Sequence, residues 1–477
     1  MTKRHLVSTF LLFVVLLCWT LSSSIGSGGD TDHHLSSIWC AWGEDANQCK
    51  DIATTEIGYS ASVPYMFQMC DGRPIDFHPE CEFVSENANM QRLRTSPPES
   101  QSLYYKIMHI FVLKNVHTSV LMMRIFNSLL SSLLFFGALH FCSGKNRIGV
   151  IFGFLTTLIS ESIVTITSIN PRSWAALGVI FSWAFLYELL TSTKPHRDKR
   201  FMVAFYLLAC LLPLSSRIDA STFLVFSNCL IVLLILIERG FSHRQIFKLG
   251  IWILIPFPVL LFLVPRLRNI FVIHGSATYG NLQFFVMQLV HIPESTAQIW
   301  GYDVGQQGNG PGLIGLIGFG VFIVCLVLAL QEVNFQQKLI LLLTACFIFL
   351  TMFRGSLLVD SLVPLGGRYV LSLSAFFMGI AFVASTASLN FFAKKGFRSS
   401  VTVFLSLAHF LALYSNIEFF TKRGQNIGFF DVLSLRGSWW WNSWSSPNWI
   451  FILGVISFMF FLKSTLDLLS NSITAEL

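Results

Sequence analysis

Residues 312–330 have the sequence GLIGLIGFGVFIVCLVLAL, a charge-free run of about 20 apolar residues. A run of this length crosses the hydrocarbon core of a bilayer as an α-helix. Similar runs recur along the chain, and we expect about twelve spans, at roughly 6–21, 117–142, 148–168, 173–192, 201–215, 220–238, 247–264, 312–330, 338–353, 369–388, 399–418 and 448–466. The predicted fold class is therefore an all-α polytopic membrane protein.

The composition of the whole chain agrees with this interpretation. The 477 residues are 53% hydrophobic and only 12% charged, and the mean hydropathy is +0.64. Soluble domains contain about 25% charged residues, so a water-facing globule is excluded. A barrel is excluded because its strands alternate apolar and polar residues, and a disordered chain because it lacks such apolar runs.

Lys and Arg are concentrated in alternate short loops, which predicts the orientation of the spans. With the N-terminus inside, the inner loops carry Lys145 and Arg147, then Lys194, Arg197, Lys199 and Arg200, then Arg239, Arg244 and Lys248, then Lys338, then Lys394, Lys395 and Arg398. Short loops rich in Lys and Arg lie on the cytoplasmic side. We therefore expect two cytoplasmic termini and extracytoplasmic segments at about 25–116, 267–311, 354–367 and 419–447. A cleavable signal peptide is the alternative for the first run, because small residues follow it at 22–28.

The predicted organisation follows from these spans. It comprises a first transmembrane helix (1–24), an extracytoplasmic loop with an interfacial helix (25–116), transmembrane helices 2–7 (117–266), a second extracytoplasmic loop (267–311), and transmembrane helices 8–12 with a Trp-rich outer loop (312–477).

Four of the ten Cys, namely Cys40, Cys49, Cys70 and Cys81, fall in the first extracytoplasmic segment. Four Cys in such a segment predict two disulfides, and the short separations favour Cys40–Cys49 and Cys70–Cys81. A zinc site with His33, His34 and His78 is the rival interpretation. The Cys separations of nine and eleven are not those of a zinc module.

Two polar motifs in this segment could carry chemistry. Asp30-Thr31-Asp32-His33-His34 follows the first helix closely. These residues could form a helix N-cap, a general base at the membrane surface, or a site for a divalent metal held by the two Asp. Further along, Pro97-Pro98 precedes Leu103-Tyr104-Tyr105, and the prolines predict a turn that leads into an interfacial helix.

Charged residues also occur within the apolar runs. Arg124 and Glu161 are candidates for lining a water-filled cavity, because charges at membrane depth are costly. Asp219 and Glu418 lie near expected outer helix ends, where a charge is ordinary.

An Asp-containing motif just outside the first span, a large first loop and a Pro-Pro…Tyr-Tyr segment together resemble the GT-C superfamily of membrane glycosyltransferases. Four local matches are similar to a bacterial family of uncharacterised, GT-C-like polytopic membrane proteins. They are Asp30 to His34, Pro97-Pro98 with Leu103-Tyr104-Tyr105, Asn170-Pro171-Arg172, and Gly367-Arg368-Tyr369. Two positions depart from that family's pattern, because Arg172 replaces an acid and Gly366 replaces Gln.

The resemblance implies an inverting transferase that moves a sugar from a polyprenyl-phosphate donor to an extracytoplasmic envelope acceptor. The implied catalytic residues are Asp30 and Asp32, one of which would deprotonate the acceptor hydroxyl. Arg368 would contact the lipid phosphate. The other implied substrate-binding residues are His34, Tyr104, Tyr105 and Tyr369. No cofactor or metal is expected, nor is nucleic acid as a partner.

Two other functions stay open at the level of sequence. A transporter or flippase of a lipid-linked or polar solute would use the buried charges as its pathway, although transporters commonly have two matching halves. A non-catalytic scaffold of the cell envelope is the third interpretation.

Overall fold

The computed structural model describes residues 2–23, 31–44, 49–55, 58–65, 89–95, 102–159, 161–192, 196–240, 286, 312–331, 333–359, 370–385, 394–421 and 446–474. The helices are α1 (Thr2–Ser22), α2 (Thr31–Trp39), α3 (Leu103–Met108), the 3-10 helix η3 (His109–Phe111), α4 (Val116–Phe141), α5 (Gly144–Thr157), α6 (Glu161–Thr167), α7 (Arg172–Thr191), α8 (His196–Ser216), α9 (Ile218–Glu238), α14 (Gly312–Leu330), α15 (Phe335–Val359), α16 (Leu371–Ala384), α18 (Lys395–Thr421) and α19 (Pro447–Thr474). The strands are β1 (Lys50–Thr55), β2 (Gly58–Tyr65) and β3 (Asn89–Thr95).

Nine helices in the described part of the chain are long and apolar enough to cross a membrane. They are α1, α4, α7, α8, α9, α14, α15, α18 and α19, and each coincides with an expected span. Helix α16, with 14 residues, falls within the span expected at 369–388. The span expected at 247–264 lies outside the described residues. The predicted fold class, a nearly all-α polytopic membrane protein, is confirmed.

The span expected at 148–168 is broken in the structure, which the sequence did not predict. Helices α5 and α6 cover this region as a pair bent by 99°. The hydroxyls of Thr156 and Thr157 donate to the carbonyls of Phe152 and Gly153 at 2.8 and 2.9 Å, a pattern that bends helices. Leu158 then leaves the helical conformation, with φ −79° and ψ 53°. Hydropathy does not register this break because the residues on both sides of it are apolar.

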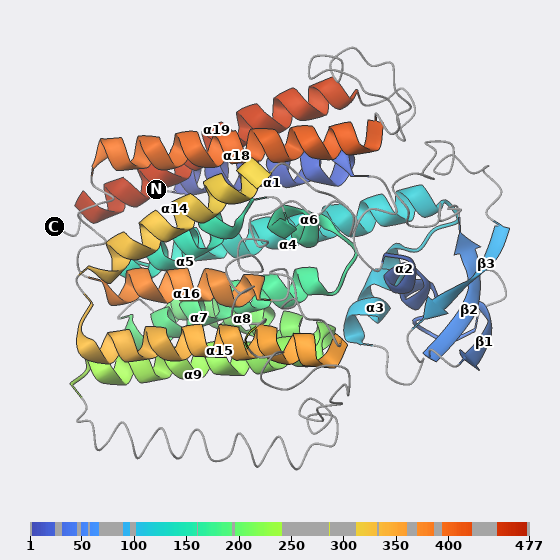
Figure 1. Cartoon of the computed structure of the whole chain (residues 1–477), viewed down its shortest axis with the longest axis horizontal. Coiled ribbons are helices and arrows are strands. Elements are labelled where there is room, and N and C mark those ends of the chain that lie inside the picture. The colour runs from blue at the N-terminus through green and yellow to red at the C-terminus, as the bar shows by residue number, and fades with distance from the viewer. Residues whose placement is uncertain are drawn as a thin grey trace.

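The helices pack as one bundle in which the first and last helices are neighbours (Figure 1). Helix α1 contacts α19 and α4, and a hydrogen bond of 2.7 Å joins the Ser8 and Ser464 hydroxyls. Helices α7, α8 and α9 form another packed group, and α16 lies between α5 and this group. Buried Phe, Leu and Ile side chains fill the space between these layers.

Small residues allow α5 and α16 to approach backbone to backbone. Gly149 and Gly153, one turn apart on α5, face Gly379 and Ala375 on α16. A Cβ atom added to Gly149 would come within 2.5 Å of the Gly379 carbonyl oxygen, and one added to Gly153 would overlap the Ala375 carbonyl. Helices in membranes associate through such small-residue faces because lipid provides no hydrophobic drive between them.

One end of the bundle carries an additional layer, which we call the sheet-bearing end (Figure 1). It consists of α2, α3, η3 and a three-stranded antiparallel sheet in the order β1-β2-β3. The sequence predicted a helix after the proline pair, which α3 and η3 provide, but it did not predict the sheet. The Cys40–Cys49 disulfide joins the end of α2 to the start of β1 and confirms one predicted pairing. Cys70 and Cys81 lie outside the described residues.

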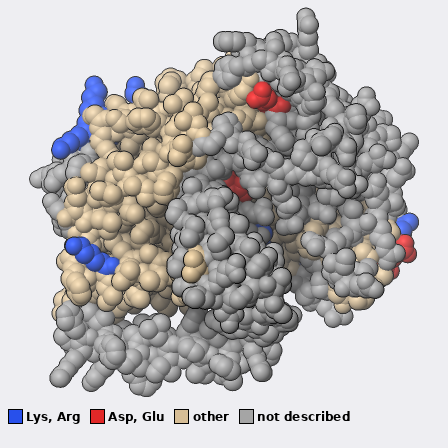
Figure 2. Space-filling view, in the orientation of Figure 1, with Lys and Arg blue, Asp and Glu red and all other residues tan. Residues whose placement is uncertain are grey.

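Both chain termini lie at the end of the bundle opposite the sheet (Figure 1). The face of the molecule in Figure 2 has most of its visible Lys and Arg side chains at this same end. Lys145 and Lys338 lie in the first turns of α5 and α15, and Lys394 directly precedes α18, at helix connections that alternate with those of the sheet-bearing end. These three Lys residues of the expected inner loops therefore lie at the end of the bundle opposite the sheet, and the predicted orientation in the membrane stays a prediction.

Candidate functional site

Helix α2 brings the first polar motif against α3. The His34 imidazole Nδ1 shares a hydrogen bond of 2.8 Å with the Tyr105 hydroxyl, and their rings stack with centroids 6.0 Å apart. Both side chains are buried, at 5% and 6% exposure. His109 Nδ1 donates to the Ile38 carbonyl at 2.8 Å and fixes the other end of α2. Two motifs 71 residues apart in sequence therefore meet in the structure.

Tyr104 anchors α3 to the transmembrane bundle. Its fully buried ring packs edge-on against Trp174 of α7, with centroids 4.9 Å apart. Trp174 Nε1 donates to Asn127 Oδ1 at 2.9 Å, and Asn127 Nδ2 donates to the Ser168 carbonyl at 2.7 Å. Burial raises the pKa of Tyr104 far above its ordinary value, so the phenol stays protonated at neutral pH. Its expected contact with substrate stays a prediction.

The two candidate bases are only partly described. Asp30 lies outside the described residues. The backbone of Asp32 lies in the first turn of α2, where the helix dipole favours a negative charge, and its side chain is outside the description. Arg368 and Tyr369 also lie outside it, although the next residue, Val370, is the N-cap of α16.

The end of α1, from which the chain leaves toward Asp30, is held by two buried polar side chains. Arg124 of α4 donates from Nη1 to the Ser23 carbonyl at 2.8 Å. Asn416 of α18 donates from Nδ2 to the Ser22 carbonyl at 3.0 Å and to the Ser22 and Ser23 hydroxyls at 2.8 and 3.1 Å. Arg124, a candidate for lining a cavity, compensates a C-terminal carbonyl of α1, and a role in lining a cavity stays a prediction. Asn416 could not be singled out from the sequence.

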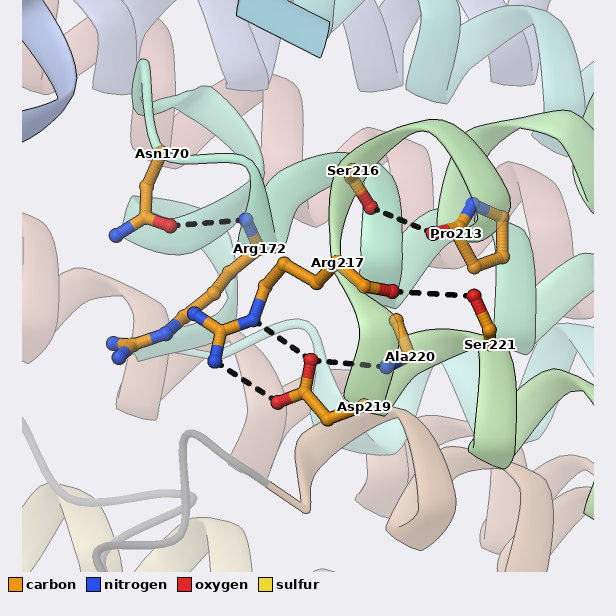
Figure 3. A network of polar contacts seen from close by, with 8 residues as sticks. All are labelled: Asn170, Arg172, Pro213, Ser216, Arg217, Asp219, Ala220 and Ser221. Atoms are coloured by element: carbon orange, nitrogen blue, oxygen red, sulfur yellow. Dashed lines mark hydrogen bonds and ion pairs between the residues drawn. The ribbon is translucent and has the colours of Figure 1, made fainter. Parts of the chain in front are cut away.

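The Asn-Pro-Arg motif forms the start of α7. Asn170 Oδ1 accepts the Arg172 backbone N–H at 2.9 Å, and Pro171 occupies the N-cap position. In the view of Figure 3, the Arg172 side chain extends from this helix start to the left, away from Asp219 and Ala220 of α9. The motif therefore places a guanidinium group at the start of α7.

Arg172 lines a pocket between the first turns of α7, α9 and α16. Its cavity volume is about 30 Å³. Arg217, the N-cap of α9, forms two hydrogen bonds of 2.9 Å with the Asp219 carboxylate. Arg172 is close enough to interact electrostatically with Asp219. The remaining lining residues are Ala175, Ala176, Ala220, Phe223, Leu371 and Ser372.

Sequence reasoning missed most of this pocket. Asp219 was interpreted as an ordinary charge at a helix end, and Arg217 was not considered. The available signal was the spacing of Arg217 and Asp219 at a predicted span boundary, which favours a local ion pair. This spacing carries no information about Arg172, which lies 45 residues before Arg217. Only the packing of α7 against α9 brings these charges together.

The fold defines the class of the molecule as a polytopic helical membrane protein with a small α/β layer at one end. The chain belongs to the family described as Predicted membrane protein (DUF2142), whose model matches residues 12–376. The match extends from α1 into α16, so it includes every segment that forms the sheet-bearing end and the pocket. No curated protein and no solved structure matches the chain significantly.

Proposed function

We propose that the protein is an inverting glycosyltransferase that uses a polyprenyl-phosphate sugar donor. The observation that carries this proposal is the convergence of three motif segments at the sheet-bearing end. His34 contacts Tyr105, Tyr104 contacts Trp174, and Trp174 stands two residues after Arg172. A hydroxyl acceptor and a lipid-linked donor could meet at this end, because the spans α7 and α9 both begin here.

In the proposed reaction, Asp30 or Asp32 removes the proton from the acceptor hydroxyl. The acceptor oxygen then attacks the anomeric carbon of the sugar, and the bond from that carbon to the lipid phosphate oxygen breaks. The inverted configuration follows from this single displacement. Arg368 offsets the negative charge that develops on the leaving phosphate.

His34 and Tyr105 support the proposed base by holding its helix in place. Their hydrogen bond and the His109–Ile38 bond fix α2 against α3 and η3 at both ends. Arg124 and Asn416 fix the end of α1 on the other side of Asp30. The two helices that flank the proposed base in sequence, α1 and α2, are therefore both fixed, and a proton transfer requires such fixed geometry.

The proposed active face is extracytoplasmic, in the cell membrane. The basis is the Lys and Arg asymmetry, which assigns the end with both termini to the cytoplasm. A donor carrying its sugar on that outer face would reach the sheet-bearing end directly from the bilayer.

The test is complementation of a deletion strain with the Asp30→Asn, Asp32→Asn and double variants. General acid–base catalysis contributes about 10²–10⁴ in rate, so loss of the base should reduce transfer by that order. The lipid-linked donor should accumulate and the acceptor glycan should be truncated. Asp51→Asn is the matched control, because Asp51 is an exposed carboxylate on β1 of the same segment.

Normal glycan elongation in all three Asp variants would refute the transferase. Accumulation of the donor on the cytoplasmic leaflet alone would instead favour the transporter or flippase, since a flippase moves its lipid between leaflets without consuming it.

A further inference from the structure

One side of the segment formed by α3 and η3 is apolar and exposed. Leu103, Ile110 and Leu113 are 52%, 74% and 45% exposed. The opposite side, which carries Tyr104 and Tyr105, is buried against α2 and the bundle. Large apolar side chains that gather at a surface mark a contact with a membrane or with another protein. The segment is therefore amphipathic, and its apolar side is open to a further contact.

Trp42, just beyond the end of α2, extends this apolar side onto a second element. It is 68% exposed, and the Lys106 ammonium lies 5.2 Å from its ring centroid in a cation–π contact. Lys106 stands three residues after Leu103 and four before Ile110, spacings that place all three on one side of a helix. The Cys40–Cys49 disulfide closes the turn that carries Trp42. The surface that we call the interfacial face comprises Trp42, Leu103, Lys106, Ile110, Leu113 and Lys114.

The interfacial face continues the lipid-facing sides of two transmembrane helices. On α4, Met122, Leu129 and Leu133 are exposed although they belong to a candidate span. On α8, Leu211 and Leu214 are exposed in the same way. Apolar side chains on the outside of a span contact lipid. Helix α4 follows η3 directly, α3 contacts α8, and Figure 1 shows α3 beside α2 at this end of the bundle. The lipid-contacting surface thus reaches the interfacial face without a change of side.

Two lysines indicate the kind of lipid that this face contacts. Lys106 and Lys114 stand beside its apolar residues, and neither forms an ion pair within the described part of the chain. The carboxylate of Glu44, close to Trp42 in sequence, accepts the Ile52 N–H at 2.7 Å. Basic side chains beside a bilayer are attracted to anionic headgroups, while Trp and Lys each combine an apolar body with a polar tip that suits the membrane–water interface.

We propose that the interfacial face lies among the headgroups of the leaflet at the sheet-bearing end and binds anionic phospholipids there. Trp42, Leu103 and Ile110 enter the boundary between headgroups and acyl chains, and Lys106 and Lys114 contact the anionic headgroups. The sequence predicted only a helix at the interface. The structure adds Trp42 from a second element, so the bilayer also holds α2 and, through the disulfide, β1. The partner is the bulk lipid, so the inference does not depend on a transferase activity.

Photo-cross-linking of the full-length protein in vesicles tests the contact. A p-benzoyl-phenylalanine residue replaces Ile110, and the vesicles contain radiolabelled phosphatidylcholine. Irradiation joins the benzophenone to neighbouring C–H bonds, and the radioactivity that stays with the denatured protein is measured. The same residue at Leu129, on the lipid-facing side of α4, is the positive control, and at Thr54, exposed on β1, it is the negative control. Leu103 provides a second test position if the Ile110 variant is not monodisperse.

We expect the lipid adduct at position 110 to approach that at position 129 and to exceed that at position 54 several-fold. A yield at positions 110 and 103 no higher than at position 54 would overturn the proposal. A cross-linked dimer at these positions in place of the lipid adduct would also overturn it and assign the face to a second copy of the chain.

A change of lipid tests the preference for negative charge. Replacing part of the phosphatidylcholine by phosphatidylglycerol should raise the adduct at position 110 about twofold or more, since each Lys near the surface is attracted to anionic lipid. Lys106→Gln/Lys114→Gln should abolish this increase and keep the yield in phosphatidylcholine alone. Lys338→Gln, near the start of α15, is the matched control and should keep the increase. An increase that persists in the double variant, or none in the unsubstituted protein, would refute the binding of anionic lipid.

Discussion

At the scale of single residues, the hydrogen bond between His34 and Tyr105 is the most consequential contact of the sheet-bearing end. Tyr105→Phe leaves the buried imidazole nitrogen without this partner. We expect the free energy of unfolding to fall by about 1–3 kcal/mol, because a buried polar group that loses its partner keeps its desolvation cost. Thermal unfolding of the purified protein measures the change, with Tyr59→Phe on β2 as the control.

A double-mutant cycle then isolates the pair. The effects of His34→Ala and Tyr105→Phe should be non-additive, because the hydrogen bond between them is already lost in either single variant. Additive effects would show that the 2.8 Å bond does not contribute as proposed.

Asn416 gives a second prediction at this scale. Its amide holds the last turn of α1 through three hydrogen bonds. Asn416→Ala should lower the free energy of unfolding by about 1–3 kcal/mol, since the buried Ser22 carbonyl loses a donor. The control is Asn228→Ala on α9, whose side-chain oxygen accepts no hydrogen bond among the described residues. Equal unfolding temperatures for both variants would contradict this role.

The residues of the candidate site were predictable to different degrees. His34, Tyr104 and Tyr105 could be singled out because they stand in polar motifs next to a membrane span, where apolar packing does not explain them. Asn416 could not, because one amide within an apolar helix is compatible with many partners. The proximity of Arg172 to Arg217 depends on helix packing, about which a single sequence carries little information.

At the scale of elements, the close approach of α5 and α16 provides a stringent test of helix packing. Gly153→Leu should separate these helices, because even a Cβ atom there overlaps the Ala375 carbonyl. We expect a loss of several kcal/mol or failure to fold, since overpacking alone costs about 1–3 kcal/mol and a displaced backbone adds to it. Gly320→Leu is the matched control on α14, because nothing lies within 4 Å of an added Cβ there.

The yield of monodisperse protein after detergent extraction measures both Gly variants. Equal yields and equal unfolding temperatures would mean that α5 and α16 do not pack at this distance in the bilayer.

The disulfide between α2 and β1 gives the second prediction for an element. Cys40→Ser/Cys49→Ser should lower stability by roughly 2–3 kcal/mol on the chain-entropy model, whose mechanism is disputed. Peptide mapping without reduction should also recover the Cys70–Cys81 bridge, which stays a prediction. A bridge that joins the two pairs, or free thiols at all four positions, would contradict the pairing.

Most of the transmembrane elements were predictable because each requires only a long apolar run. The strands of the sheet were not, since β1 has the polar sequence KDIATT and shows no regular alternation. The break between α5 and α6 depends on backbone bonding by Thr156 and Thr157, and apolarity does not report it.

At the scale of the whole molecule, the orientation in the membrane can be measured directly. Lys114→Cys lies between η3 and α4 at the sheet-bearing end, and Lys338→Cys lies near the start of α15. In intact cells, a membrane-impermeant thiol reagent should label position 114 and not position 338, because Lys and Arg mark the cytoplasmic end. The unsubstituted protein is the control for its own Cys residues. The reverse labelling pattern would invert the proposed topology and place the candidate site in the cytoplasm.

The contact between α1 and α19 has a consequence for biosynthesis. The two serines that it joins are 456 residues apart. At about 5–20 residues per second, a ribosome would complete α19 roughly 23 to 91 seconds after α1 has been synthesised. During this interval the face of α1 that finally contacts α19 must be covered by lipid or by an insertion chaperone. Nonsense mutations that remove only the last helix should therefore expose the first one to membrane quality-control proteases.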